Sequence, residues 1–390
     1  MNKKYTLFIY IICILFLIQP TPAIEISTLS PNNETNIEGA IEYTNSLRAI
    51  RQKTYMALRK NYINNPTHLN NISRQLYNAI DMFIFGVGSS ITVHEVGHTN
   101  AYKYNGASYI RLGTGNNNDA SLLELYTLSV INGGAFATAA GYPSAIYNSP
   151  TTRTLDSGAG TNANWTFKNR ILINSLQQNK LTFTEHNDLA GTHLAVLIYI
   201  NEPLDGRDGN DFKSYLDAMQ EKQGYDISIE SLRTHFLLSS LLSYTFTPIY
   251  IENSRINSTE FKSIKINKFR LFYPEFTPYL MPTAVTQQVE LFFKSKQLAS
   301  LAYEFPIHGN KSQSEVTLGW YPVYNKLNLK FRLSITNTYT TYLSMNHKFK
   351  LSRRFSLMTK AFIGNLSTFA QKREALSNNS TYALGIHYKL

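Results

Sequence analysis

The feature that most constrains this chain is the sequence Ile-Thr-Val-His-Glu-Val-Gly-His-Thr-Asn at residues 91–100. It places His94 and His98 four residues apart, with Glu95 directly after the first histidine. On a helix, residues i and i+4 lie one turn apart on the same face, so two imidazole nitrogens can bind one metal ion. Glu95 falls at the edge of that face, where a carboxylate can deprotonate a metal-bound water. This spacing predicts a zinc hydrolase helix.

The residues before the motif favour a buried helix. Residues 82–93 are twelve uncharged and mostly apolar residues. A buried helix that carries a metal needs such a run, because a charge in the packed face would lack a partner. The alternative is that two histidines and a glutamate fall together by chance on a surface helix.

Catalytic zinc normally takes three protein ligands, so a third must lie elsewhere in the chain. Glu124 follows His98 by 26 residues, near the spacing at which a second helix supplies a glutamate. Residues 121–124 also read as a capping box, which would bind Glu124 to its own helix end. His186 and His193, seven residues apart, share one helical face and could bind metal or stabilise an oxyanion.

A further candidate is Asp205, in the sequence Asn-Glu-Pro-Leu-Asp-Gly that follows an apolar helix. An apolar His-Glu-Val-Gly-His helix followed by this turn resembles the site-2 protease-like membrane metallopeptidases over about residues 80–210. The resemblance implies that Asp205 is the third metal ligand and Glu95 the base, with Asn201 near the substrate backbone. From the residues alone, Asp205 and Gly206 could equally form a turn, with Asp208 and Asp211 as solvated neighbours.

The expected chemistry follows from the charge of zinc. Zinc lowers the pKa of its bound water to about 7, and Glu95 takes the proton. The hydroxide then attacks a peptide carbonyl, with His193 or Asn201 as an oxyanion donor beside the metal. Glu95 finally passes the proton to the leaving amine.

The first 23 residues predict a signal peptide. Lys3 and Lys4 precede an apolar stretch at residues 5–18, and Thr-Pro-Ala at residues 21–23 is a suitable cleavage site. Cys13, the single cysteine, lies inside this segment. We therefore expect an exported protein of the cell envelope, in the periplasm or outer membrane, without thiol chemistry.

Positive charge is concentrated in the second half of the chain. The net charge is +11, and residues 251–390 hold nineteen Lys and Arg against seven Glu and no Asp. These positive residues alternate with apolar ones instead of clustering, which argues against a nucleic-acid partner. A solvated surface, or one that faces anionic membrane lipid, is the expectation.

Helical periodicity predicts helices at residues 39–63, 71–104, 187–200, 211–223 and 229–243. Residues 24–38 are predicted to form a polar leader, and residues 150–164 a loop. The uncharged residues 125–152, rich in alanine and glycine, suggest a buried helix or a membrane span.

Beyond Tyr244 the period changes to two, with about eight strands joined by short turns. Two architectures fit: an antiparallel sandwich or a small membrane barrel. The alternation over the last ten residues resembles the closing strand of bacterial outer-membrane barrels.

The prediction is an α+β protein in three parts: a signal peptide (1–23), a helical metallopeptidase-like domain (24–250) and an antiparallel β domain (251–390). The expected function is zinc-dependent hydrolysis of a protein or peptide substrate by an envelope-associated enzyme, with lipid as a partner. Two alternatives stay open. One is a non-catalytic outer-membrane protein with an incidental motif, and the other is an intramembrane site-2-like protease.

Overall fold

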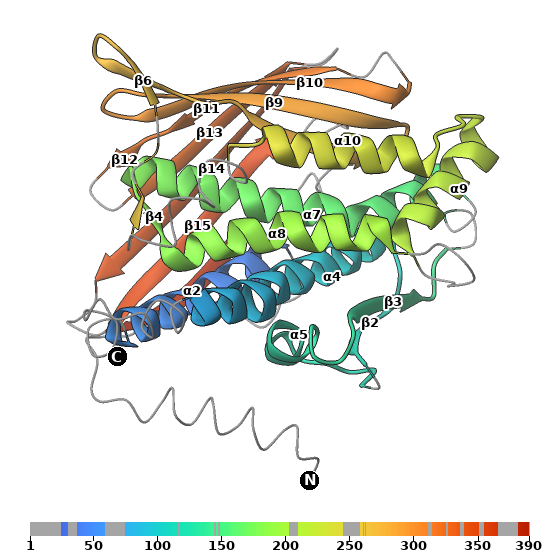
Figure 1. Cartoon of the computed structure of the whole chain (residues 1–390), viewed down its shortest axis with the longest axis horizontal. Coiled ribbons are helices and arrows are strands. Elements are labelled where there is room, and N and C mark those ends of the chain that lie inside the picture. The colour runs from blue at the N-terminus through green and yellow to red at the C-terminus, as the bar shows by residue number, and fades with distance from the viewer. Residues whose placement is uncertain are drawn as a thin grey trace.

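The chain packs a group of helices against one face of an antiparallel sheet, as the computed structural model in Figure 1 shows. The structure describes residues 25–29, 37–58, 75–115, 117–143, 146, 149–202 and 210–244, and then residues 258–389 apart from 260, 262, 311–313, 325–326, 336–338, 351–354 and 366–380. The predicted signal peptide (1–23) lies outside these residues. The predicted α+β class is confirmed, with helices toward the N-terminus and the antiparallel sheet toward the C-terminus.

The helices follow the predicted periodicity closely where the apolar pattern is strong. They are α2 (Ile37–Leu58), a π-helical segment η3 (Asp81–Gly86), α4 (Val87–Tyr104), α5 (Leu122–Leu128), α7 (Pro150–Gln178), α8 (Phe183–Asn201), α9 (Asp211–Gln223) and α10 (Ile229–Leu242). Helix α8 begins four residues before the predicted start, because Thr182 and Glu185 form a capping box at its N-terminus.

The described pairings of the main sheet run in the order β1-β16-β15-β14-β13-β11-β10-β9-β7-β6, with β12 beside β13 and β8 beside β9. The strands are β1 (Glu25–Leu29), β6 (Ser263–Ile266), β7 (Phe269–Phe272), β8 (Glu275–Met281), β9 (Ala284–Lys294), β10 (Leu298–Gly309), β11 (Glu315–Tyr321), β12 (Val323–Tyr324), β13 (Leu327–Ile335), β14 (Tyr339–Lys350), β15 (Phe355–Asn365) and β16 (Thr381–Lys389). The sheet thus exceeds the eight predicted strands. Among the described pairings, β1 and β6 are its ends and do not pair with each other, so these strands do not close a barrel.

Two segments fold differently from the prediction. Residues 150–164, predicted as a loop, form the first half of α7. Their small polar residues have weak helix propensity, but tertiary packing overrides it, since Thr154, Thr161 and Asn162 are fully or almost fully buried. Pro150 starts the helix, and Asn179, in the left-handed conformation, ends it.

Residues 125–152 do not form one helix. The described residues of this range belong to the end of α5, a turn, the strand β3 (Ala135–Ala140) and the start of α7. Strand β3 pairs with β2 (Tyr109–Thr114) in a separate two-stranded sheet. Gly133 and Gly134 have φ of 80° and 129°, which a continuous helix cannot accommodate. Residues 25–29, predicted as part of a polar leader, form a strand that pairs with β16.

Helix α7 packs against both α4 and strand β8 of the sheet. A Cβ added to Gly97 would lie 2.6 Å from Cβ of Ala163 and 2.7 Å from the carbonyl oxygen of Ala159, so the glycine lets α4 and α7 approach closely. Among the described residues, one helix, Gln75–Tyr104, is long and apolar enough to cross a membrane, and half of its most apolar window is buried within the protein. That helix carries the His-Glu-Val-Gly-His sequence.

Candidate metal centre

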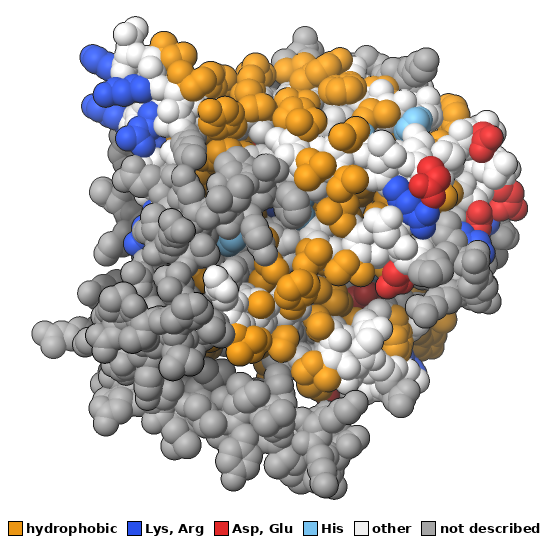
Figure 2. Space-filling model, in the orientation of Figure 1, with side chains coloured by type: hydrophobic (Ala, Val, Ile, Leu, Met, Phe, Trp, Pro, Cys, Tyr) orange, Lys and Arg blue, Asp and Glu red, His pale blue; other side chains and the backbone are white. Residues whose placement is uncertain are grey.

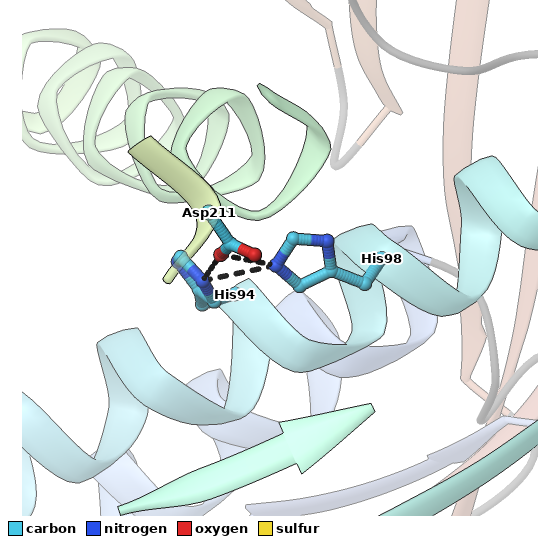
Figure 3. A group of neighbouring side chains, drawn as sticks. All are labelled: His94, His98 and Asp211. Carbon is cyan, nitrogen blue, oxygen red and sulfur yellow. Dashed lines mark hydrogen bonds and ion pairs between the residues drawn. The ribbon is translucent and has the colours of Figure 1, made fainter. Parts of the chain in front are cut away.

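Three side chains from two distant parts of the chain converge at the middle of α4. Nε2 of His94 and Nε2 of His98 lie 3.1 Å apart. Oδ2 of Asp211, at the start of α9, lies 3.0 Å from the first nitrogen and 2.8 Å from the second. Figure 3 shows the two rings and the carboxylate pointing toward one another.

The spacing of these atoms suits a small divalent cation. Ligand atoms about 2.0–2.1 Å from a tetrahedral zinc ion are roughly 3.3 Å apart. The observed separations are a few tenths of an ångström shorter, so a small outward movement would admit the ion. His94 and His98 are buried and Asp211 is partly buried, which is typical of a site closed on the protein side and open on another.

Hydrogen bonds to the other ring nitrogens orient both imidazoles. Nδ1 of His98 lies 2.7 Å from the backbone oxygen of Asp156, which fixes the proton on Nδ1 and leaves Nε2 to bind a metal. Nδ1 of His94 lies 3.1 Å from the side-chain amide of Asn164. The other amide atom, Oδ1 of Asn164, is buried and has no hydrogen-bond partner among the described residues. Rotating the amide by half a turn would let this oxygen accept a hydrogen bond from the Nδ1–H of His94, the tautomer that a metal on Nε2 requires.

The space beside the two ring nitrogens depends on a glycine of α7. A Cβ added to Gly160 would lie 2.4 Å from Nε2 of His98 and 2.5 Å from Nε2 of His94. A side chain at this position would therefore occupy the volume that faces both metal-binding nitrogens. The absence of a side chain here, together with the unpartnered amide oxygen of Asn164, fits a metal site.

Asp211 is held in place by its neighbours. Asn210 caps α9 by accepting hydrogen bonds from the backbone of Phe212 and Lys213. The backbone N–H of Asp211 donates to the hydroxyl of Tyr199 (3.1 Å), and the ring of Tyr199 lies edge-on to His94. The carboxylate thus enters the site from the end of a capped helix.

The charges of the site favour an ionised carboxylate beside a protonated ring. Burial opposes ionisation of Asp211, but His98 and His94 outweigh it and hold the pKa of Asp211 well below its usual range. Burial disfavours the charged form of His98, yet Asp211 outweighs that cost and raises the pKa of His98 to about 9. A positive charge is therefore favoured where a metal cation would bind.

Glu95 is buried next to the triad. Burial raises its pKa against the opposing influence of His94 and His98. The backbone N–H of Ala137, in strand β3, donates a hydrogen bond to the Glu95 carboxylate. The Tyr102 hydroxyl donates to the carbonyl oxygen of the same alanine (3.3 Å), so β3 is fixed beside the carboxylate.

The structure brings together only part of the predicted site. His94, His98 and Glu95 lie at one place, as predicted from their spacing. Glu124 does not join them: it is partly exposed and accepts hydrogen bonds from the backbone and hydroxyl of Ser121, in the capping box that was the alternative. Asp205 lies outside the described residues.

His193 and Asn201, the predicted oxyanion donors, have hydrogen-bond partners outside the metal centre. His193 is buried, with Nδ1 3.0 Å from the hydroxyl of Ser240 and its ring against Trp165. Asn201 is exposed and donates to the carbonyl oxygen of Leu197, within its own helix. His186 is buried, 3.3 Å from the side chain of Asn187. The described metal cluster includes none of these three residues.

Sequence reasoning missed Asp211, Asn164 and Gly160. Asp211 was interpreted as a solvated neighbour of a turn, although the sequence did predict that it starts a helix. Asn164 and Gly160 were assigned to a loop. Neither residue had a clear signal in the sequence. The run of glycine, threonine and asparagine around them is long enough for a helix, but it has weak helix propensity, and its burial becomes known only from the fold.

Comparison of the chain with known protein families, with curated proteins and with solved structures found no match. The functional argument therefore depends on the geometry of the site.

Proposed function

We propose that this protein binds a divalent metal ion, zinc in the first place, through His94, His98 and Asp211 and hydrolyses peptide bonds. The observation that carries the proposal is the convergence of two imidazole nitrogens and one carboxylate oxygen within 3.1 Å of one another, with a buried glutamate beside them. Two histidines and one carboxylate are a donor set of catalytic zinc sites.

The metal, when bound, supplies a Lewis acid and an acidic water molecule. The chain supplies the remaining functions. Asp156 and Asn164 keep the imidazoles oriented, and Tyr199 keeps Asp211 at the site. Glu95 acts as the general base: its raised pKa brings the carboxylate nearer the working pH, where proton transfer in both directions is effective.

Zinc is favoured over harder cations by the donor atoms. Imidazole nitrogen suits zinc and other late transition metals, whereas magnesium and calcium prefer oxygen ligands throughout. Peptide hydrolysis is favoured because a carboxylate directly follows the first histidine of the pair, which is the arrangement of metallopeptidase helices.

The test compares metal content and hydrolysis in matched variants. We expect purified protein to contain about one zinc per chain by elemental analysis and to cleave an unstructured protein such as casein. Glu95→Gln is expected to keep the metal and lose at least about a hundredfold in rate, since it removes only the base. Asp211→Asn is expected to lose metal, whereas Asp217→Asn, an exposed position on the same helix α9, keeps both properties.

Two results would contradict the proposal. Metal content that is unchanged by Asp211→Asn would mean that the triad is not the binding site. Metal bound by the triad without any hydrolysis, or hydrolysis unaffected by Glu95→Gln, would leave a metal-binding envelope protein as the better interpretation.

A further inference from the structure

The part of the sheet formed by β9, β10 and β11 places apolar residues on its outer face. The register aligns nine outward positions in three cross-strand rows, and all nine residues are apolar or aromatic: Val289, Tyr303 and Val316; Leu291, Leu301 and Leu318; Phe293, Ala299 and Trp320. Four of them are well exposed, with Leu301 at 39%, Tyr303 at 49%, Leu318 at 44% and Trp320 at 46%. We call these nine residues the outer apolar face.

The inner face of the same strands turns toward the helices and is mixed: Phe292, Leu298 and Tyr321 join the hydrophobic core near the β9–β10 turn, and two other rows are polar. These two rows align Gln288, Glu304 and Glu315, and next to them Glu290, Ala302 and Thr317, all of them buried. Glu304 accepts a hydrogen bond from Thr286 and Glu315 accepts one from Thr317. Antiparallel sheets in water have the opposite arrangement, with apolar residues inside and polar ones outside. Polar-in and apolar-out is the pattern of strands that face lipid.

A basic hairpin borders one end of the outer apolar face. Strands β6 and β7 expose Lys265, Lys268 and Arg270, and the register places Arg270 opposite Lys294 and Leu271 opposite Phe293. The hairpin is therefore next to the row that ends in Trp320. Figure 2 shows Lys and Arg gathered at the corner where β6 lies, beside apolar side chains along the edge formed by β9 and β10.

Trp320 lies where an apolar region meets a polar one. Its ring is on the outer apolar face, and its Nε1 donates to the side chain of Gln297 in the turn between β9 and β10 (2.8 Å). Tryptophan with a polar partner, next to lysine and arginine, is typical of the boundary between acyl chains and headgroups. Lysines near this boundary extend toward the headgroups.

We propose that the outer apolar face contacts the acyl chains of a lipid bilayer, with anionic headgroups bound by the β6–β7 hairpin. The three outer apolar rows, which lie over buried polar rows, provide the apolar contact, and the basic hairpin provides the charge complementarity. This inference concerns the sheet alone and does not depend on the metal centre. The register places Lys265 and Arg270 on the same side of the sheet as Lys294, so the hairpin carries its charge at the end of the apolar rows and not among them. A second copy of the chain would cover the apolar rows but would leave this charge without a negatively charged counterpart.

Trp320 itself reports on this contact. The chain has two tryptophans, and the other, Trp165, is fully buried. We expect the full-length protein to show a blue shift of tryptophan emission and loss of acrylamide quenching with vesicles of phosphatidylcholine and phosphatidylglycerol. Both changes should be smaller with phosphatidylcholine alone and absent in Trp320→Phe. Unchanged emission and quenching with anionic vesicles would overturn the proposal.

Vesicle flotation with paired variants separates apolar from electrostatic contributions. Leu301→Glu with Leu318→Glu should reduce the bound fraction at least about tenfold, since each charge must be buried in lipid. Leu123→Glu, equally exposed but on α5, should bind as the unaltered protein does. Lys265→Glu with Lys268→Glu should remove the preference for anionic lipid, and Arg111→Glu on β2 should keep it.

The alternative occupant of the outer apolar face is a second copy of the chain, and it can be tested in the absence of lipid. Protection of Trp320 that develops with protein concentration in the absence of vesicles, together with a dimer mass by light scattering, would overturn the lipid assignment in favour of a second copy. Equal loss of binding in Leu123→Glu and the sheet variants would also overturn it. Circular dichroism of each variant shows whether it is folded, and a folded sheet variant that still floats contradicts the proposal.

Discussion

Oδ2 of Asp211 lies 2.8 Å from Nε2 of His98, although the two residues are 113 positions apart in the chain. The contact joins the first residue of α9 to the middle of α4. Helix α7 passes beside both helices, and its Gly160 faces the two ring nitrogens. The site is therefore a product of how three helices pack, and its parts can be tested one at a time.

The first prediction concerns Gly160. Replacement by alanine places a methyl group within about 2.5 Å of both ring nitrogens, so we expect metal binding to fall at least a hundredfold. Helix propensity alone would favour the alanine, by about 1 kcal/mol. Zinc titration by calorimetry measures the loss, and Ser157→Ala on the same helix serves as the control that should bind normally. Normal affinity in Gly160→Ala would mean that the metal does not occupy this space.

The second prediction concerns the residues that orient the ligands. Asn164→Ala removes the partner of His94 Nδ1, and Tyr199→Phe removes the hydroxyl that accepts from the backbone of Asp211. Loss of such outer partners typically costs 10- to 100-fold in metal affinity or activity. We expect both variants to bind zinc more weakly while their helical content stays unchanged. A competition assay with a coloured chelator gives the affinities.

The third prediction concerns a buried ionic cluster that holds α2 to its neighbours. The Arg51 guanidinium pairs with Asp81 and with Asp188, each at 2.6 Å, and donates to the hydroxyl of Tyr126. Removing one partner of such a pair leaves uncompensated buried charge and costs about 3–5 kcal/mol. Arg51→Met should therefore lower the free energy of unfolding in urea by about that amount.

The control for this measurement is the exposed pair of Arg153 with Glu221, whose charged atoms lie 3.0 Å apart. Surface pairs contribute about 0–1 kcal/mol, so Arg153→Met should change the unfolding midpoint little. If the two variants were equally stable, the cluster around Arg51 would not hold the helices together.

The fourth prediction concerns stability at acidic pH. Burial lowers the pKa of His186 to about 4 and that of His235 to about 4, against an unfolded value near 6.5. A group whose pKa is lower in the folded state binds more protons when unfolded, so stability is lost as pH falls from about 6.5 toward 4. For His186, which is almost fully buried, the loss can reach about 3 kcal/mol.

Urea unfolding at pH 7, 5.5 and 4.5 measures this dependence. His186→Gln should flatten the decline between pH 6.5 and 4.5 relative to the unaltered protein. Carboxylates contribute to acid sensitivity in both proteins, so the difference between their slopes isolates the histidine. Parallel slopes would show that His186 is protonated equally in the folded and unfolded states.

Much of the helical architecture could be predicted because it is local. The stretches that became α2, α4, α9 and α10 repeat apolar residues at helical spacing, and Asn210 and Ser228 cap the starts of α9 and α10. The alternation beyond Tyr244 likewise predicted antiparallel strands, although it could not predict that residues 25–29 would join the last strand. Such a pairing is fixed by contact between the two ends of the chain.

Residues 150–164 illustrate why the remainder was missed. Threonine, glycine, serine and asparagine form loops when solvated, since their side chains compete for the backbone. In α7 they are buried against α4 and β8, where small side chains permit close contact and amides bond to neighbouring backbone, as Asn162 does to Leu280. Helix propensity predicted a loop for these residues, but their burial in the fold stabilises a helix.

The sequence by itself determined that His94, Glu95 and His98 would lie on one turn of a helix, because the i and i+4 relationship is a property of the local backbone. Only the tertiary structure decided that Asp211 completes the triad instead of Glu124. Several acidic residues were equally available in sequence, and the choice between them depends on which helix end packs against α4 and which carboxylate is already bonded in a cap. The identity of the third ligand therefore depends on long-range packing, and it cannot be predicted from spacing along the chain.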